Sequence, residues 1–150
     1  MNKEMVDFLP LKEMIEKEQE IQTILKKSEN NIYIVPLKEA TNSSNFLQIT
    51  FRINEETLVL SWLYLLHENK GTGSRIIEWL INYCTMNNLN IFKIVNVERN
   101  KKGMRELCKK YNFFEIKCKE EFSDYYLYIT PDNYQETHFS EDLKGKIHFE

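Results

Sequence analysis

The sequence predicts an α/β domain in which a mixed central β-sheet carries helices on both faces. Segments with apolar residues at helical spacing alternate with short runs that have the composition of strands. One of these runs, residues 57–66, is apolar on both faces, which is typical of a strand in the middle of a covered sheet. No internal repeat or Pro-, Gly- or Ser-rich linker interrupts the chain. We therefore expect one domain over residues 1–131 and a C-terminal extension over 132–150.

The composition is that of a globular protein: 42% of the 150 residues are hydrophobic, 13% aromatic and 29% charged. The net charge of −3 gives no general attraction for nucleic acid or an anionic membrane, so neither is expected as a partner. Three cysteines without a C-x-x-C spacing argue against a zinc ribbon or a disulfide framework. No segment has the pattern of a signal peptide or of a membrane span, which needs ~20 apolar residues. We expect a cytoplasmic protein without a bound metal.

The N-terminal half is predicted to hold one helix followed by three strands. Apolar residues recur at helical spacing over Pro10–Leu25, and Lys26-Lys27 suits the end of that helix. Asn31–Leu37 is predicted as a short strand. Phe46–Ile53 and Thr57–Leu66 are predicted as the next two strands, joined by a hairpin turn.

The C-terminal half is predicted to alternate helices and strands. The pattern predicts helices over Thr72–Met86 and Lys101–Tyr111, and strands over Asn90–Val97, Phe113–Cys118 and Asp124–Ile129. Asn112 follows the second helix at a position where asparagine tolerates the left-handed conformation that ends many helices. The polar extension after residue 131 is assigned to no helix or strand.

A glycine turn joins the central strand to the next helix. Gly71–Gly73 stands between a buried strand and an amphipathic helix. Glycine lets a backbone approach a ligand closely, and a helix N-terminus carries a partial positive charge, so this junction suits a phosphate. Lys70 and Arg75 add charge of the same sign. The alternative is a plain turn with a glycine cap. Ile76 replaces the third glycine of a dinucleotide-binding fingerprint, and no G-x-x-x-x-G-K-[ST] loop is present.

Two motifs in this context resemble the GNAT family of N-acetyltransferases. The pyrophosphate loop of that family, [RQ]-x-x-G-x-[GA], is similar to Glu68–Gly73, and a later pattern, L-Y-x-K-x-G-F, is similar to Leu107–Phe113. The order of elements also matches, and the resemblance covers residues 10–129. It implies the GNAT (acyl-CoA N-acyltransferase) fold, with acetyl-CoA as cosubstrate and no metal.

The resemblance also implies where acetyl-CoA binds. The pyrophosphate would lie on the backbone N–H groups of residues 70–74, and the pantetheine arm beside the strand at residues 62–65. The 3′-phosphate would lie near Lys101, with Arg99 and Lys102 as alternatives. The implied cofactor-binding residues are Trp62, Leu63, Leu65, Glu68, Asn69, Lys70, Gly71, Thr72, Gly73, Ser74, Arg75 and Lys101.

The chain departs from the family pattern at three positions. Glu68 stands where arginine or glutamine is usual, and Asn112 replaces a glycine. Cys108 stands where many members carry the tyrosine that protonates the departing thiolate. It is either a catalytic acid or a core cysteine, and Tyr111, one turn later, is the other candidate acid.

The sequence offers more than one candidate for the general base. An amine acceptor must lose a proton before it attacks, and many family members use a glutamate on the fourth or fifth strand for this step. The aligned position of the fifth strand holds Asn96. Glu98, two residues later, shares the face of Asn96 if the strand continues, and His67 beside the loop is a second candidate. Some members use no dedicated base and depend on positioning.

The resemblance implies an N-acetyltransferase that passes the acetyl group of acetyl-CoA directly to a primary amine through a tetrahedral intermediate. The acceptor is a small-molecule or protein amine; residues 119–124 form an acidic loop that suits a cationic amine or is simply solvated. The alternative is a degenerate GNAT-fold domain that binds a CoA thioester or a protein partner without turnover. A third interpretation, acetylation of charged tRNA, is favoured by four lysines within residues 101–110 and opposed by the net charge. The resemblance is also compatible with a homodimer, because edge strands in that family often pair between subunits.

Overall fold

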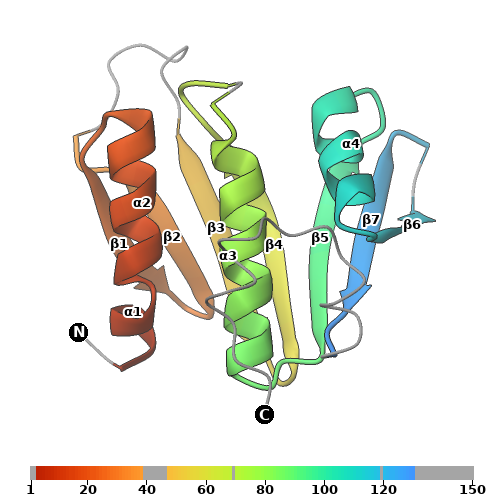
Figure 1. Ribbon diagram of the computed structural model, residues 1–150, viewed down its shortest axis with the longest axis horizontal. Helices are drawn as coiled ribbons and strands as arrows, with labels where there is room; N and C mark the ends of the chain where they lie inside the picture. The colour runs from red at the N-terminus through yellow and green to blue at the C-terminus, as the bar shows by residue number, and fades with distance from the viewer. Residues whose placement is uncertain (1–2, 39–46, 69, 119, 131–150) are drawn as a thin grey trace. The chain divides into compact units, whose positions relative to one another are not determined.

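The computed structural model describes residues 3–38, 47–68, 70–118 and 120–130 (Figure 1). Within these ranges the helices are α1 (Lys3–Asp7), α2 (Leu9–Gln19), α3 (Thr72–Met86) and α4 (Lys102–Lys110). The strands there are β1 (Thr23–Ser28), β2 (Asn31–Pro36), β3 (Gln48–Asn54), β4 (Thr57–Tyr64), β5 (Ile91–Glu98), β6 (Phe114–Lys117) and β7 (Phe122–Tyr128). The expectations for Asn69, Lys119 and the extension 132–150 lie outside the described residues.

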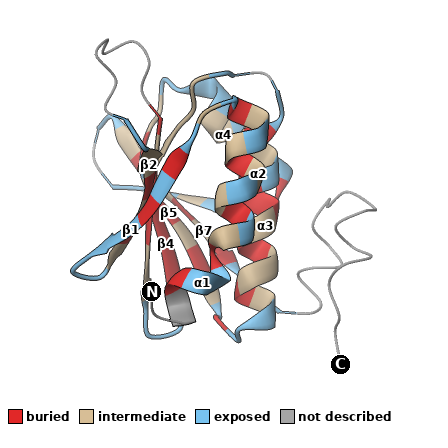
Figure 2. Ribbon diagram, turned by 90° about the vertical axis from the view of Figure 1, so that its left-hand side faces the viewer, coloured by how far each residue is buried: buried red, intermediate tan, exposed pale blue. Residues whose placement is uncertain are grey.

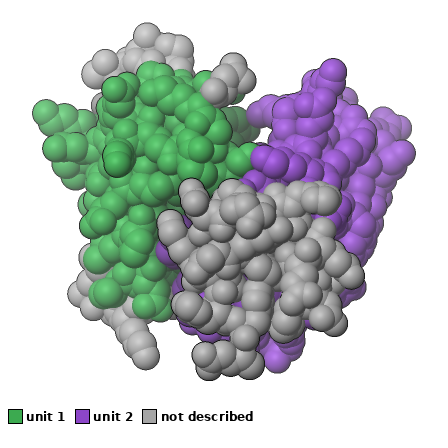
Figure 3. All heavy atoms as spheres, in the orientation of Figure 1, with its two compact units in different colours: residues 1–52, 60–76 green, residues 53–59, 77–150 purple. Residues whose placement is uncertain are grey.

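The described strands form one sheet in the order β1-β2-β3-β4-β5-β7-β6. The pairs β1–β2, β2–β3, β5–β7 and β6–β7 are antiparallel. The chain divides into two compact units, coloured separately in Figure 3: unit 1 is Met1–Arg52 with Leu60–Ile76, and unit 2 is Ile53–Val59 with Ile77–Glu150. None of the helices in the described ranges has the length and apolarity needed to cross a membrane.

Helix α2 ends at Gln19 because the next residue changes the direction of the chain. Glu20 adopts the left-handed conformation, with φ 55°, and its N–H donates to the carbonyl of Glu16. The carboxylate of Glu16 also accepts the N–H of Thr23 at 2.6 Å. This bond ties the first residue of β1 to the last turns of α2.

The prediction of a helix that reaches residue 27 is therefore wrong. Residues 23–28 pair with β2 as a strand, so four strands precede α3 where the sequence predicted three. Thr23 and Leu25 are buried, whereas Ile24 is 41% exposed. That alternation is the two-residue period of a strand, which the apolar residues of this short segment fit as well as a helical period.

The later elements agree with the sequence prediction to within a few residues. Helix α3 covers Thr72–Met86, as predicted, and Asn88 beyond its end is left-handed, with φ 57°. Asn112 is also left-handed, with φ 64°, as predicted. Strand β4 lies in the interior of the strand order, in agreement with its two apolar faces.

Each unit has its own buried aromatic contact. In unit 1, the rings of Phe8 and Phe51 meet edge to face with centroids 4.7 Å apart, and both side chains are fully buried. In unit 2, Phe92 and Phe113 make a similar contact at 5.3 Å. Burial of such rings supplies a large part of the hydrophobic stabilisation of a domain of this size.

Within each unit the helices lie on one side of the strands (Figure 2). In unit 1, side-chain hydrogen bonds join α2 to the first turn of α3. In unit 2, Tyr111 at the end of α4 donates to Glu78 of α3. Buried residues alternate with half-buried residues along β2 and β5. The sequence predicted helices on both faces; within a unit they cover one face, and antiparallel strands tolerate solvent on the other.

Replacing Phe51 with alanine is expected to destabilise the protein by about 3–5 kcal/mol, because it leaves a cavity beside Phe8. Urea unfolding measures the loss. Ile24→Ala, at an exposed position of β1, serves as the control and is expected to cost under about 1 kcal/mol. Equal losses for the two variants would contradict this assignment of the core.

Candidate functional site

Residues 65–71 join β4 to α3 in unit 1. Strand β4 ends at Tyr64, and α3 begins at Thr72. Gly71 precedes the helix with φ 79°, a conformation that glycine adopts without steric cost. Its carbonyl accepts the N–H of Arg75 at 3.1 Å, which closes the first turn. The first N–H groups of a helix have no partners within the helix, so this end of α3 presents backbone donors.

The side chain of Gln19 holds the two ends of this loop together. It extends from the last turn of α2 and is fully buried. Its amide nitrogen donates to the carbonyl of His67 and to the hydroxyl of Thr72, both at 3.0 Å. Its amide oxygen accepts the N–H of His67 at 2.7 Å. Because a buried amide must have hydrogen-bond partners, these bonds fix the separation of the two loop ends.

The carboxylate of Glu18 lies beside the first turn of α3. It accepts hydrogen bonds from the Thr72 hydroxyl at 2.8 Å and from Arg75 Nε at 2.6 Å, and a further one from Arg75 Nη2. Burial, the largest influence, would raise the pKa of Glu18. Hydrogen bonds from Arg75 and Thr72, together with the charge of Arg75, outweigh burial and hold that pKa below its ordinary value. Glu18 is therefore an anion at neutral pH.

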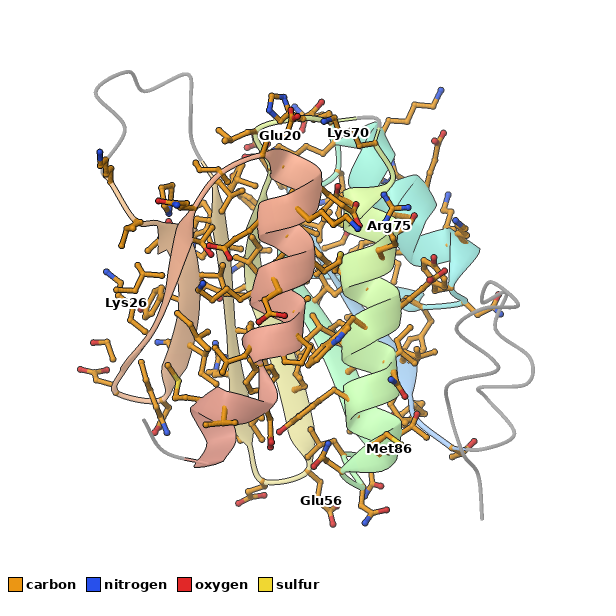
Figure 4. The ribbon with its side chains drawn as sticks, turned by 60° about the vertical axis from the view of Figure 1, so that its left-hand side comes forward. Glu20, Lys26, Glu56, Lys70, Arg75 and Met86 are labelled. Atoms are coloured by element: carbon orange, nitrogen blue, oxygen red, sulfur yellow. The ribbon has the colours of Figure 1, made fainter. Side chains whose placement is uncertain are left out.

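Lys70 is also placed against a carboxylate. Its ammonium lies 3.6 Å from the carboxylate of Glu20 and donates to the carbonyl of Glu18 at 3.3 Å. Figure 4 shows Glu20, Lys70 and Arg75 near the end of α2 and the start of α3. The sequence predicted that Lys70 and Arg75 add positive charge for a phosphate. Since each has a carboxylate beside it, the backbone donors of the loop carry more of that attraction than the sequence indicated.

The other predicted cofactor residues of unit 1 lie along β4 and the loop. Trp62 is 47% exposed, and its ring centroid lies 5.1 Å from that of Tyr64. Glu68 and the alternative base His67 are exposed. The half-buried residues of this set are Leu63, Leu65, Gly73 and Ser74. The described cofactor residues of the strand and loop therefore fall in one unit, whereas Lys101 belongs to unit 2.

A β-bulge changes the faces of the last residues of β5. The pairing with β7 shifts between Ile94 and Val97, and Asn96 is left-handed there, with φ 57°. Its N–H donates to Asp124 Oδ1 at 2.9 Å. In a regular strand Asn96 and Glu98 would share the buried face of Ile94. The bulge gives that place to Val97, and Glu98 is half-buried on the opposite face.

Cys108 is buried in unit 2. Burial raises the pKa of its thiol to about 12, with a smaller contribution from the negative charge of Glu115. Proton transfer from such a thiol to a thiolate of ordinary basicity is unfavourable. This environment favours a core role for Cys108 over proton donation.

Tyr111 and Lys101 lie at the two ends of α4. Tyr111 is fully buried, and its hydroxyl donates to Glu78 Oε1 at 2.6 Å. Lys101 is exposed, and its N–H donates to the carbonyl of Glu98 at 2.9 Å. In the part of the chain that the structure describes, no group of three or more His, Cys, Asp or Glu side chains is arranged to hold a metal ion.

No protein-family model and no curated protein matches this sequence, but solved structures match the fold. The Campylobacter jejuni N-acetyltransferase PseH aligns with 83% of this chain and 82% of its own, at 17% identity and a TM-score of 0.52. The Escherichia coli ribosomal-protein-S18-alanine N-acetyltransferase aligns over 82% and 77%, at 12% identity and a TM-score of 0.52. The Thermoplasma acidophilum PaiA N-acetyltransferase, solved with coenzyme A, aligns over 66% and 61%, at 13% identity and a TM-score of 0.52.

The chain has the fold of the GNAT N-acetyltransferases. The expected GNAT fold is thereby confirmed. The match to the Thermoplasma protein spans less than two thirds of that protein's length. PseH has also been solved in complex with acetyl coenzyme A. At these identities the likeness concerns the GNAT fold alone.

Two residues beside the loop of this GNAT-fold chain, Glu18 and Gln19, are absent from the sequence prediction. The sequence does contain an indication that Gln19 is buried: it follows Leu11 and Ile15 at intervals of four on the buried stripe of α2. A polar residue in such a stripe requires a buried partner. Nothing in the sequence sets Glu18 apart, because charged residues are frequent throughout that helix.

Gly71→Ala is expected to destabilise the protein by about 1–2 kcal/mol, since alanine resists the left-handed conformation. The added Cβ would also lie 3.0 Å from Arg75 Nη1. Gly103→Ala is the matched control: it lies in α4 with nothing within 4 Å of the added Cβ, and should stabilise by about 0.5–1 kcal/mol. Urea unfolding measures the change in the free energy of unfolding for both variants. A change of the same sign in both would contradict this geometry.

The native protein is expected to expose one reactive thiol. Cys118 is exposed, whereas Cys84 and Cys108 are buried. The pKa is raised for all three thiols, so exposure sets the difference in their rates. A chromogenic disulfide reagent at pH 8 should react rapidly with one thiol in native protein and with three after denaturation. Cys118→Ser should abolish the rapid phase. Rapid reaction of Cys108 in that variant would contradict its assignment to the core.

Proposed function

We propose that this chain is an acyltransferase that passes the acetyl group of acetyl-CoA to a primary amine. One observation carries the proposal. At the junction of β4 and α3 in a GNAT fold, Gly71 is left-handed and the helix opens directly behind it. That arrangement offers backbone N–H groups and the positive end of a helix to an anion, and acetyl-CoA carries a pyrophosphate.

The strand and the loop supply the two halves of the cofactor site in this proposal. The pyrophosphate binds the N–H groups of residues 70–74, and the pantetheine arm runs along residues 62–65. Glu68 is exposed, which lets its carboxylate turn away from the phosphates. Carboxylates beside Lys70 and Arg75 reduce the local positive charge, so binding depends more on backbone donors than on these side chains.

The reaction in this proposal is direct transfer. The neutral amine attacks the thioester carbonyl, and a tetrahedral oxyanion forms. A backbone N–H near Leu63–Leu65 stabilises the oxyanion. The C–S bond then breaks, the thiolate of CoA leaves and takes up a proton, and the amide loses its extra proton. Positioning of the two substrates supplies a large part of the acceleration.

Glu98 and Tyr111 are the proposed proton carriers. Glu98 is half-buried at the end of β5, where a carboxylate can accept a proton from the amine. The Tyr111 hydroxyl is directed at Glu78, so it would serve as an acid only by exchanging that partner for the thiolate. Burial raises the pKa of Cys108, which disfavours that thiol as the acid.

The acceptor in this proposal is a positively charged amine of a small molecule or a protein. Glu120 and Glu121 are exposed in the loop before β7. Asp124 is occupied, because it lies 3.8 Å from the ammonium of Lys93 and accepts the N–H of Asn96. The two glutamates therefore carry the attraction for a cation. Turnover of spermidine compared with a neutral amine tests this choice, and equal rates would reject it.

A second candidate function is binding of a CoA thioester, or of a protein partner, without turnover. The observation that favours it is the burial of both candidate acids: Cys108 has a raised pKa, and Tyr111 donates to Glu78. Binding of acetyl-CoA without release of CoA in the presence of amines would establish this alternative.

Acetyl-CoA is expected to raise the melting temperature of the wild-type protein. A ligand at 100 times its Kd adds about 2.7 kcal/mol, which shifts the melting temperature of a domain of this size by roughly 5–11 °C. Gly73→Glu should abolish the shift, because it places a carboxylate where the pyrophosphate binds. Ser28→Glu, which adds the same charge at an exposed position of β1, should keep it. A folded wild-type protein without any shift would reject the cofactor site.

A further inference from the structure

The last turn of α2 contacts the loop before α3 and the first turn of α3 through two adjacent side chains. We expect these side chains to have opposite effects on the binding of a diphosphate. Gln19 binds the backbone at the start of the loop and the hydroxyl at its end. Glu18 binds the same hydroxyl and the guanidinium of Arg75. The proposed acetyl transfer assigns no role to either residue.

Gln19 acts on the shape of the loop. It makes one bond as acceptor and one as donor with the backbone of His67, and donates to Thr72 with the same amide nitrogen. A side chain that bonds to both ends of a loop fixes the separation of those ends before a ligand arrives. Ordering of a loop in advance reduces the entropic cost of binding.

Glu18 acts on the charge of the loop. Its carboxylate is already an anion at the start of α3, and three donor atoms of Thr72 and Arg75 are directed at it. A diphosphate at this helix end would be drawn to the same guanidinium and repelled by the same carboxylate. The charged groups around Glu18 are Arg75, Lys70, Lys17 and Glu20, and among them Arg75 makes the shortest contact with it.

We propose that the last turn of α2 sets the affinity of the loop for the diphosphate of its nucleotide. Gln19 is a positioning residue that holds the loop ready, and Glu18 is an internal anion that competes with the diphosphate for Arg75. This inference rests on the proposed CoA site. It predicts changes of opposite sign at two adjacent positions, which a purely structural role for this turn would not produce.

Calorimetric titration of the full chain with CoA tests the inference. Glu18→Gln keeps the size of the side chain and removes its charge, so CoA should bind roughly threefold to tenfold more tightly, the range for one partly screened charge. Glu13→Gln is the matched control: it removes the same charge from an exposed position of α2 and should change the Kd by less than about twofold.

Gln19→Leu should weaken CoA binding by roughly tenfold, because His67 and Thr72 lose their buried partner. Gln22→Leu, the same replacement at an exposed position, is its control. If Gln19→Leu does not fold, Glu18→Gln still decides, since it leaves the bonds of Gln19 in place.

The competition itself is tested in the Arg75→Gln background. In that background Glu18→Gln should raise the affinity for CoA by a smaller factor, because the cation for which Glu18 and the diphosphate compete has been removed. An undiminished gain, or a wild-type Kd in Glu18→Gln, would overturn the inference while leaving the CoA site intact. A wild-type protein that binds no CoA would overturn both the inference and the proposed function.

Discussion

The buried amide of Gln19 is the interaction on which the candidate site depends. Three hydrogen bonds link it to His67 and Thr72, and the one to the Thr72 hydroxyl is buried at both ends. Helix α2 ends at this residue, and the chain turns away directly after it. The left-handed Glu20 provides that exit, and the loop after β4 closes on the other side of the amide.

The charges around this amide determine what the loop can attract. Glu18 in the last turn of α2 and Glu20 directly after the helix lie against Arg75 and Lys70, which are the basic residues that a sequence search for phosphate sites would select. What remains for an anion is a glycine turn and the positive end of a helix. A site of this kind binds by backbone geometry, and its affinity is open to adjustment by the carboxylates beside it.

Much of the fold was predictable because a long amphipathic segment fits the period of only one kind of secondary structure. Helix α3 matches its predicted bounds, since its stripe is continuous and Asn88 closes it. The strand at residues 23–28 was not predictable, because Ile24 fits either period and the strand is defined by its pairing with β2. The bulge at Asn96 has no sequence signal of its own. The pairing of Glu18 with Arg75 joins residues far apart in the chain, and spacing along a sequence does not reveal such contacts.

The most direct measurement is the release of free CoA from acetyl-CoA, with a panel of amines and without amine. We expect release above the amine-free rate for at least one cationic amine, and loss of that release in Gly73→Glu. Saturable binding of acetyl-CoA together with release that no amine increases would contradict acetyl transfer to an amine, and would leave a domain that binds CoA without using it.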